Sequence, residues 1–154
     1  MKLRKLGETA VREVLEPGRP AVVLAGRPYN LHDTALNMNI QRKIVQRYGV
    51  PVIPMDILPI TGIDIAPVHP HMFWNYGRKI IQAAMFIRNY ANAHLIFISN
   101  FKCGPDSYIR HYIEDACGEP FLFLQMDSHA NDAGILTRVE AFLESKQMIG
   151  RTAE

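Results

Sequence analysis

Four short, continuously apolar runs, separated by segments of helical periodicity, constrain this chain more than any other feature of its sequence. The runs lie at residues 21–25, 50–55, 95–99 and 121–125. Because their apolar residues are consecutive and do not alternate with polar ones, they indicate parallel strands covered on both faces. We therefore predict an α/β fold: a three-layer, doubly wound parallel sheet of about four strands, ordered 2-1-3-4.

The segments between the runs carry helix signals. Asp33 is placed to cap a helix whose apolar stripe contains Leu36, Ile40 and Ile44. Gly49 suits the left-handed position that follows such a helix.

Three further helices are predicted after the second strand. The first is indicated by residues spaced by threes and fours, namely Phe73, Gly77, Ile80, Ala84, Ile87 and Ala91. The next opens at Pro105 and stops at Gly118, and the last begins near Ala133. We interpret Phe73 and Trp74 as core or interface residues.

An additional helix is expected before the first strand, over residues 1–18. Its apolar stripe consists of Leu3, Leu6, Ala10 and Val14. We therefore expect one α/β domain over residues 1–154, with a Rossmann-like core over residues 20–146.

The charge pattern and the cysteine count exclude several classes of protein. The formal charge is +2, from 17 basic and 15 acidic residues spread along the chain, so we expect no nucleic-acid partner. No apolar run approaches the roughly 20 residues of a membrane span, so we expect no membrane partner and a cytoplasmic location. The two cysteines form no Cys-x-x-Cys pair, which argues against structural zinc.

Polar and special residues follow the predicted strands where ligands bind in open α/β sheets. With the order 2-1-3-4, residues 26–30 should lie beside residues 102–107. Cys103 comes directly before a helix, where exposed N–H groups and the helix dipole favour a thiolate. This is an environment for a ligand or a nucleophile, and the alternative is a cysteine buried as a small apolar residue. Cys117, at the far end of the same helix, is interpreted as structural.

The other candidates each have two interpretations. Arg27 is placed to hold an anion with Tyr29 and Asn30 as hydrogen-bond donors, or to form a buried ion pair with Asp56 or Asp106. His129 is a ligand or proton carrier, or a surface histidine.

Taken together, the loops resemble the activase-related proteins of the 2-hydroxyacyl-CoA dehydratase and double-cubane cluster system. The resemblance covers nearly everything from about residue 21 to residue 145. Its motifs run in order: GRPYN at 26–30, VIPMDILP at 52–59, NFKCGPDS at 100–107, and DSH at 127–129 followed by TRVEAF at 137–142. The resemblance implies that the chain is one lobe of a larger protein in an anaerobic, reductive dehydratase or activase system. Such proteins take part in electron transfer through iron–sulfur clusters of the 4Fe-4S kind.

The resemblance also implies partners and a set of site residues. Cys103 matches the cysteine of the Cys-Gly-Pro-Asp-Ser motif and is the expected metal ligand. The residues expected to contact a cofactor are Arg27, Tyr29, Asn30, Asp106, Ser107 and His129. The implied partners are the remaining lobe of the parent protein, an ATP-hydrolysing activator and an acyl-CoA substrate, and a homodimer is compatible with the sequence.

The chain departs from this pattern in its cysteines. Clusters are usually held by four thiolates, and only Cys103 is suitably placed, so the isolated domain should be apo and not catalytic alone. Two alternatives stay open at this point. One is acyl transfer by Cys103 as nucleophile with His129 as base, and the other is a non-catalytic lobe that binds a small anion or CoA.

Overall fold

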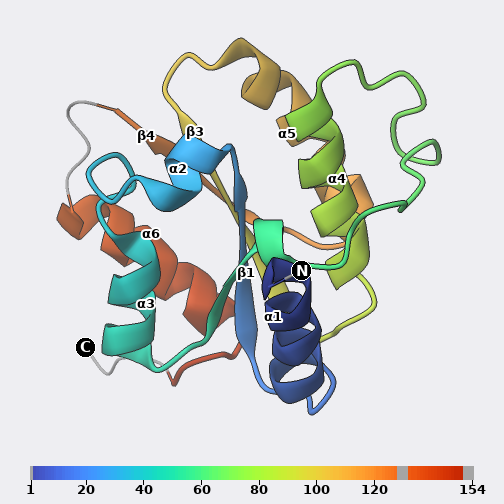
Figure 1. The fold of residues 1–154 in the computed structure, drawn as a ribbon. Coiled ribbons are helices and arrows are strands. Elements are labelled where there is room, and N and C mark those ends of the chain that lie inside the picture. Colours follow the sequence, from blue (N-terminus) through green and yellow to red (C-terminus); the bar gives the residue numbers. More distant parts are fainter. Residues whose placement is uncertain (1, 128–131, 151–154) are drawn as a thin grey trace.

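A parallel sheet forms the middle layer of the protein (Figure 1). The computed structural model describes residues 2–127 and 132–150. Within them, four strands pair in the order β2-β1-β3-β4, all parallel, as the sequence predicted. Their bounds are Ala21–Gly26 for β1, Val52–Pro54 for β2, Ala93–Asn100 for β3 and Leu122–Met126 for β4.

Burial explains why the strand residues are continuously apolar. Every residue of β1 is buried, as are all residues of β3 except the last. The two strands pair from Ala21 opposite Ala93 to Gly26 opposite Ile98. Because both strands have a neighbour on each side and helices above and below, neither face requires polar residues.

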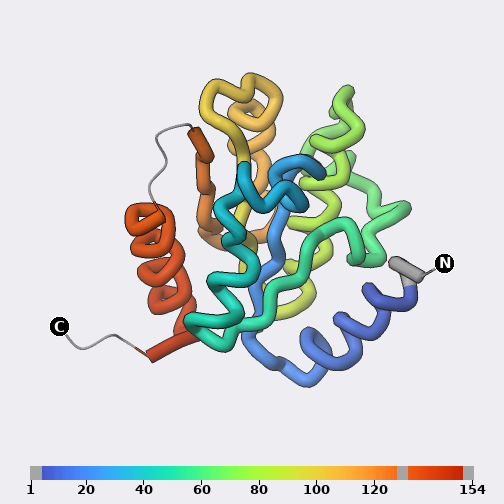
Figure 2. The backbone as a smooth tube through the Cα atoms, turned by 60° about the vertical axis from the view of Figure 1, so that its left-hand side comes forward, coloured from blue at the N-terminus to red at the C-terminus, as the bar shows by residue number. Residues whose placement is uncertain are grey.

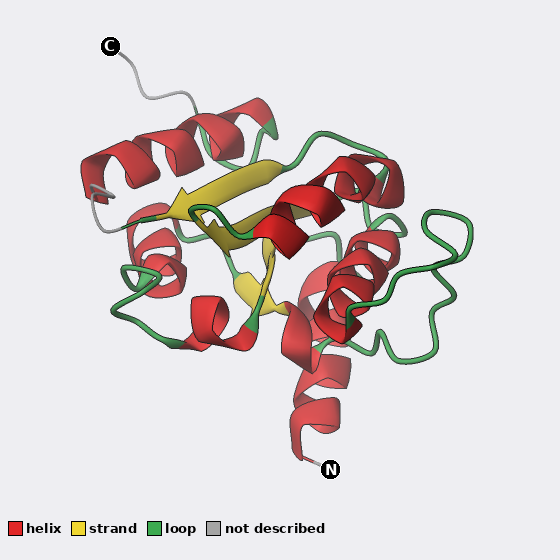
Figure 3. Ribbon diagram, turned by 90° about the horizontal axis from the view of Figure 1, so that it is seen from above, coloured by secondary structure: helices red, strands yellow, loops and turns green. Residues whose placement is uncertain are grey.

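Two pairs of helices cover the sheet, one pair on each face (Figures 1 and 3). On one face, α3 (Ile40–Tyr48) lies beside α6 (Asp132–Ser145), and Lys43 Nζ contacts Asp132 Oδ1 at 2.6 Å. On the other face, α4 (Asn75–Ile87) packs along α5 (Gly104–Cys117). This arrangement is the three-layer α/β fold that the alternation of strands and helices predicted.

The helix predicted to start at Asp33 begins later. A short helix, α2 (Pro28–His32), comes first, and the Asp33 carboxylate then accepts hydrogen bonds from the N–H groups two and three residues further on, at 2.9 and 3.2 Å. This aspartate forms a turn and does not cap α3. Residues 38 and 39 have φ values of 52° and 55°, and a right-handed helix cannot continue through them. Leu36 is therefore outside α3 and 44% exposed.

The helix predicted from Phe73 to Ala91 is shorter at both ends. Trp74 has an extended backbone, with φ −79° and ψ 124°, so α4 starts only at Asn75. Phe73 lies outside the helix and is 89% exposed, which excludes the core position considered for it. The four middle residues of the predicted stripe, Gly77, Ile80, Ala84 and Ile87, are buried as expected.

The amino-terminal helix is present, and part of its predicted stripe, Ala10 and Val14, packs against the core. It consists of α1 (Lys2–Ala10) continued by a π-helical turn, η1 (Val11–Leu15), and lies at the periphery of the fold (Figure 2). Gly7, Val11 and Leu15 are buried, whereas Leu6 is 54% exposed. The side chain of Leu3 is outside the described part of the chain.

The reason for this choice of face is a backbone contact at Gly7. A Cβ atom at this position would collide with the carbonyl oxygen of Ile57, in the short 3-10 helix η2 (Met55–Ile57). The missing side chain lets α1 lie directly against η2, an approach that no apolar stripe specifies.

The two edges of the sheet differ. The β2 edge is three residues long and ends in Pro54, whose nitrogen carries no N–H to donate to a further strand. The β4 edge is five residues long and contains no proline. None of the described helices has the length and apolar character needed to cross a membrane.

The contact at Gly7 predicts opposite outcomes for two glycine-to-alanine substitutions in helices. Gly7→Ala should lower the free energy of unfolding by about 1–3 kcal/mol, because the added methyl group forces α1 away from η2. Gly134→Ala, in α6, meets no atom within 4 Å of the new Cβ and should raise stability by up to about 1 kcal/mol. Urea unfolding followed by circular dichroism measures both. A stabilised Gly7→Ala variant would contradict this account of how α1 packs.

Candidate functional site

The loops after β1 and β3 lie side by side at the carboxyl edge of the sheet, as the strand order predicted. Gly26, the last residue of β1, lies against Ile98, and a Cβ added to Gly26 would be 2.6 Å from the Ile98 carbonyl oxygen. The loops are also joined by side chains, since Arg27 Nε donates a hydrogen bond to Asp106 Oδ1 at 3.0 Å. The crevice predicted between residues 26–30 and 102–107 is thus bridged by an ion pair.

Asp106 is the centre of this bridge. It lies in the first turn of α5, is 0% exposed, and accepts a second hydrogen bond from Ser99 Oγ at 2.7 Å. Burial lowers the pKa of Arg27, but the charges of Asp106 and Cys103 outweigh this effect, so the pKa lies above its ordinary value. Of the interpretations proposed for Arg27, the structure contains the ion pair with Asp106.

Tyr29 and Asn30 point in different directions from α2. Tyr29 is 46% exposed, and partial burial raises the pKa of its phenol while the charge of Arg27 opposes this. Asn30 is fully buried and donates from Nδ2 to the Ile98 carbonyl at 3.4 Å. Within the described residues, Asn30 Oδ1 and Arg27 Nη2 are buried atoms without a hydrogen-bond partner. Tyr29 is therefore the member of this loop that faces solvent.

Cys103 occupies the position directly before α5. Its backbone is extended, with φ −72° and ψ 105°, its N–H donates to the Asn100 carbonyl at 3.1 Å, and its carbonyl accepts the N–H of Ser107 at 2.9 Å. The residue is partly buried and its thiol is free. Lys102 before it has a φ of 62°, which turns the chain sharply out of β3. Cys103 is thus held at the start of a 14-residue helix, within electrostatic range of the Arg27 guanidinium.

Cys117 lies at the opposite end of α5 and has a different environment. It is 4% exposed, and its Sγ donates to the Glu119 carbonyl at 3.0 Å. Burial raises the pKa of this thiol. The structural interpretation of Cys117 fits these contacts.

The described residues do not gather the ligands of a metal centre. Across residues 2–127 and 132–150, no group of three or more His, Cys, Asp or Glu side chains is placed to hold a metal ion. His129, expected to contact a cofactor, lies outside the described residues. Of the two free cysteines in this part of the chain, Cys103 is partly buried and Cys117 is buried.

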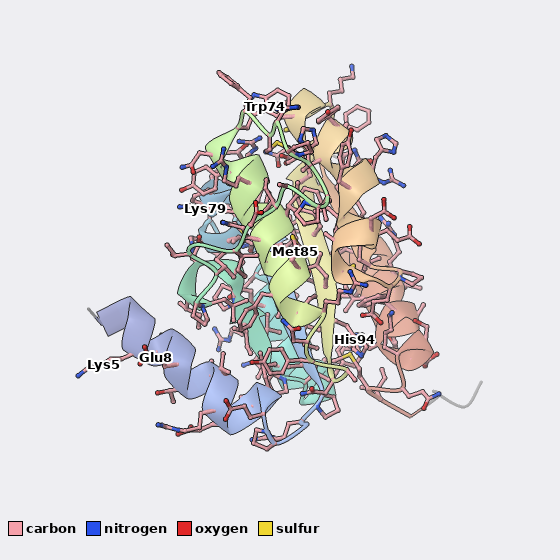
Figure 4. All side chains as sticks on the ribbon, turned by 90° about the vertical axis from the view of Figure 1, so that its right-hand side faces the viewer. Lys5, Glu8, Trp74, Lys79, Met85 and His94 are labelled. Atoms are coloured by element: carbon pink, nitrogen blue, oxygen red, sulfur yellow. The ribbon has the colours of Figure 1, made fainter. Side chains whose placement is uncertain are left out.

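An exposed aromatic rim surrounds the Cys103 loop, and sequence reasoning missed it. Eight large apolar side chains are exposed among the described residues, and five come from segments at this edge: Tyr29, Phe73, Trp74, Phe101 and Tyr108. Trp74 stands at the end of the molecule in Figure 4, and its ring contacts that of Tyr108 with centroids 5.8 Å apart. The only signal in the sequence was the interface alternative considered for Phe73 and Trp74.

A hydrogen bond ties the irregular segment before α4 to this rim. His69 Nε2 lies 2.8 Å from the Tyr108 hydroxyl, and its ring packs edge-on against Tyr112, with centroids 4.7 Å apart. The rim and the Cys103 loop are therefore parts of one surface.

The fold and this edge define an α/β domain with one partly buried cysteine at the carboxyl edge of its parallel sheet. Residues 1–58 match a family model described as the CoA enzyme activase uncharacterised domain (DUF2229). Comparison with curated proteins and with solved structures gave no match. The family match supports an activase-related protein, in agreement with the resemblance of the loops. The matched segment contains the Arg27 loop and not Cys103.

The environments of the two cysteines predict different alkylation rates in the native protein. Cys103 should react with iodoacetamide on the order of tenfold faster than Cys117, because it is more accessible and the pKa of Cys117 is raised by burial. Mass spectrometry of tryptic peptides measures both rates. The difference should vanish in denaturant, and equal native rates would contradict the assigned environments.

The hydrogen bonds at Asp106 predict that removing its carboxylate costs more stability than removing the Ser99 hydroxyl. Asp106→Ala should destabilise the protein by about 3 kcal/mol or more, because it leaves the Arg27 charge largely buried without its partner. Ser99→Ala removes one hydrogen bond and should cost about 1 kcal/mol. Denaturant unfolding measures the free energy of unfolding of both variants. Similar losses of stability would contradict the larger cost expected for breaking the ion pair.

Proposed function

We propose that this chain is one lobe of an activase-related electron-transfer protein, in which Cys103 supplies one thiolate to a 4Fe-4S cluster. The system is a reductive, anaerobic one, in which an ATP-hydrolysing activator delivers electrons and an acyl-CoA is the substrate. The lobe itself is not catalytic. The observation that carries the proposal is the position of Cys103, partly buried directly before α5 and within electrostatic range of the Arg27 guanidinium.

The surroundings of Cys103 suit a thiolate ligand. The N-terminus of a helix carries partial positive charge and unpaired N–H groups, which stabilise an anion. The Arg27 guanidinium adds a full charge, and Gly104 leaves space beside the thiol, since a Cβ there would meet no atom within 4 Å. The potential of a cluster depends on hydrogen bonds and charges of this kind.

The number of ligands limits what the described chain does alone. A cluster of this type usually takes four thiolates, and the described residues provide Cys103, while Cys117 is buried at the far end of α5. These residues do not fit a complete cluster. The other ligands must come from another polypeptide segment, and a cluster at that junction would store the electron in transit.

The aromatic rim supports a site that a partner completes. Exposed aromatic side chains are enriched at the centres of protein interfaces. Phe101, in the same loop as Cys103, is 57% exposed, and Tyr108, on the next turns of α5, is 41% exposed. A polypeptide bound to this rim would bring its own side chains to the thiol and would exclude water from it.

The two alternative functions lack an observation of this kind. Acyl transfer requires His129 as a base, and that residue is outside the described part of the chain. A site for a small anion or CoA requires the Arg27 guanidinium, which already pairs with Asp106.

The test uses the full-length polypeptide that carries this chain, reconstituted anaerobically with iron and sulfide. Cys103→Ala should lose bound iron and the electron paramagnetic resonance signal of the reduced cluster, because a ligand is removed. Cys117→Ala is the matched control on the same helix and should keep both. Iron retained in full by Cys103→Ala, or lost equally from the two variants, would overturn the proposal.

A further inference from the structure

The β4 edge of the sheet is open. The register of β4 with β3, and the hydrogen bond from Phe101 N–H to the Met126 carbonyl, orient the even-numbered residues of β4 toward β3. Because successive residues of a strand point their N–H and C=O groups to opposite sides, those of Phe121, Phe123 and Gln125 face away from the sheet. A further strand has donors and acceptors to pair with here.

The helix after β4 reaches this edge through the side chain of Arg138, but its backbone does not lie over the edge. α6 lies beside α3, where Tyr48 donates a hydrogen bond to Glu140 at 3.1 Å (Figure 1). On that face the right-handed connection from β1 through α3 leads toward the β2 edge of the sheet. A right-handed connection through α6, on the same face, would lead in the same direction. The topology thus directs the chain away from the β4 edge.

A groove of about 590 Å³ runs along the same edge, between α5 and α6. Its floor is formed by Phe121, Leu122 and Phe123 of the β4 segment, and its sides carry Arg110, Glu114 and Arg138. An apolar centre with a charged rim is the usual composition of a protein–protein interface.

The charges along the groove are arranged so that the same surface on a second copy of the chain complements them. Arg110 and Glu114 lie one turn apart on α5 and are both exposed, and neither has an ion-pair partner among the described residues. The Arg110 guanidinium lies 4.8 Å from the centre of the Phe123 ring, which fixes it above the edge. A two-fold axis that passes midway between Arg110 and Glu114 along α5 places the Arg110 of each copy opposite the Glu114 of the other.

We propose that the β4 edge binds a second copy of this chain, in antiparallel pairing about a two-fold axis near Leu122. The two sheets then form one continuous sheet, and the Phe121 and Phe123 backbone groups pair across the axis. Arg110 of each copy pairs with Glu114 of the other. Arg138, which donates to the Phe123 carbonyl at 2.7 Å, shares this acceptor with the incoming N–H, because a carbonyl oxygen has two lone pairs.

This interface is separate from the Cys103 site. The edge is parallel to the strands, whereas Cys103 lies at their carboxyl ends, so the two-fold axis leaves the two Cys103 loops at opposite ends of the pair. The dimer neither needs a cluster nor obstructs the aromatic rim. It is therefore testable in metal-free protein, independently of the proposed function.

The experiment is sedimentation equilibrium of the chain and of charge-reversed variants. Glu114→Arg and Arg110→Glu should each weaken the dimer at least about tenfold, because two attractions become two repulsions. The double variant Arg110→Glu/Glu114→Arg reverses both charges and should restore dimerisation. Asp115→Arg, an exposed reversal on the same helix outside the groove, should dimerise like the unmodified chain.

Hydrogen exchange provides a second readout that does not depend on charge. The amides of Phe121 and Phe123 should become more protected as protein concentration rises, because they pair only across the axis. The proposal is overturned if the unmodified chain stays monomeric at its highest soluble concentration. Single reversals that dimerise normally, or a double variant that stays monomeric, would equally exclude this interface.

Discussion

The ion pair between Arg27 and Asp106 is the interaction on which the carboxyl edge depends. Arg27 follows β1, Asp106 begins α5, and the hydroxyl of Ser99 at the end of β3 binds the same carboxylate. Three segments far apart in sequence are thereby joined at one buried side chain. Burying such a pair brings little net stability, but it strongly disfavours arrangements in which either charge is left alone. The conformation of the Cys103 loop follows from this requirement.

The topology of the fold could be predicted because burial acts on whole strands. In β1 and β3, hydrogen-bonded neighbours and helices on both faces favour apolar residues at most positions, and the sequence records this as near-continuous apolar runs. Helix starts were less predictable, because they depend on single backbone conformations. The left-handed residues Met38 and Asn39 delay α3 by a full turn or more, and Met38 is not a residue type that usually adopts this conformation.

The candidate site could be predicted in outline for a similar reason. The strand order brings the Arg27 and Cys103 loops together, and Pro105 marks the helix start after Cys103. What could not be predicted was the exposure of individual side chains. Phe73 looks like a core residue in a periodic stripe, and only the path of the segment before α4 leaves it 89% exposed. Likewise, Gly7 looks unremarkable in sequence, and only the fold shows that a backbone lies against it.

The inequality of the two sheet edges has a consequence for how the protein behaves at high concentration. A sheet that is open on both sides can add copies without end and grow into a fibre. Here one side is only three residues long and lacks the N–H of Pro54, so any pairing at the other side uses up the open edge of both molecules. Assembly through the sheet therefore stops at two copies, and the short strand that ends in Pro54 opposes further aggregation.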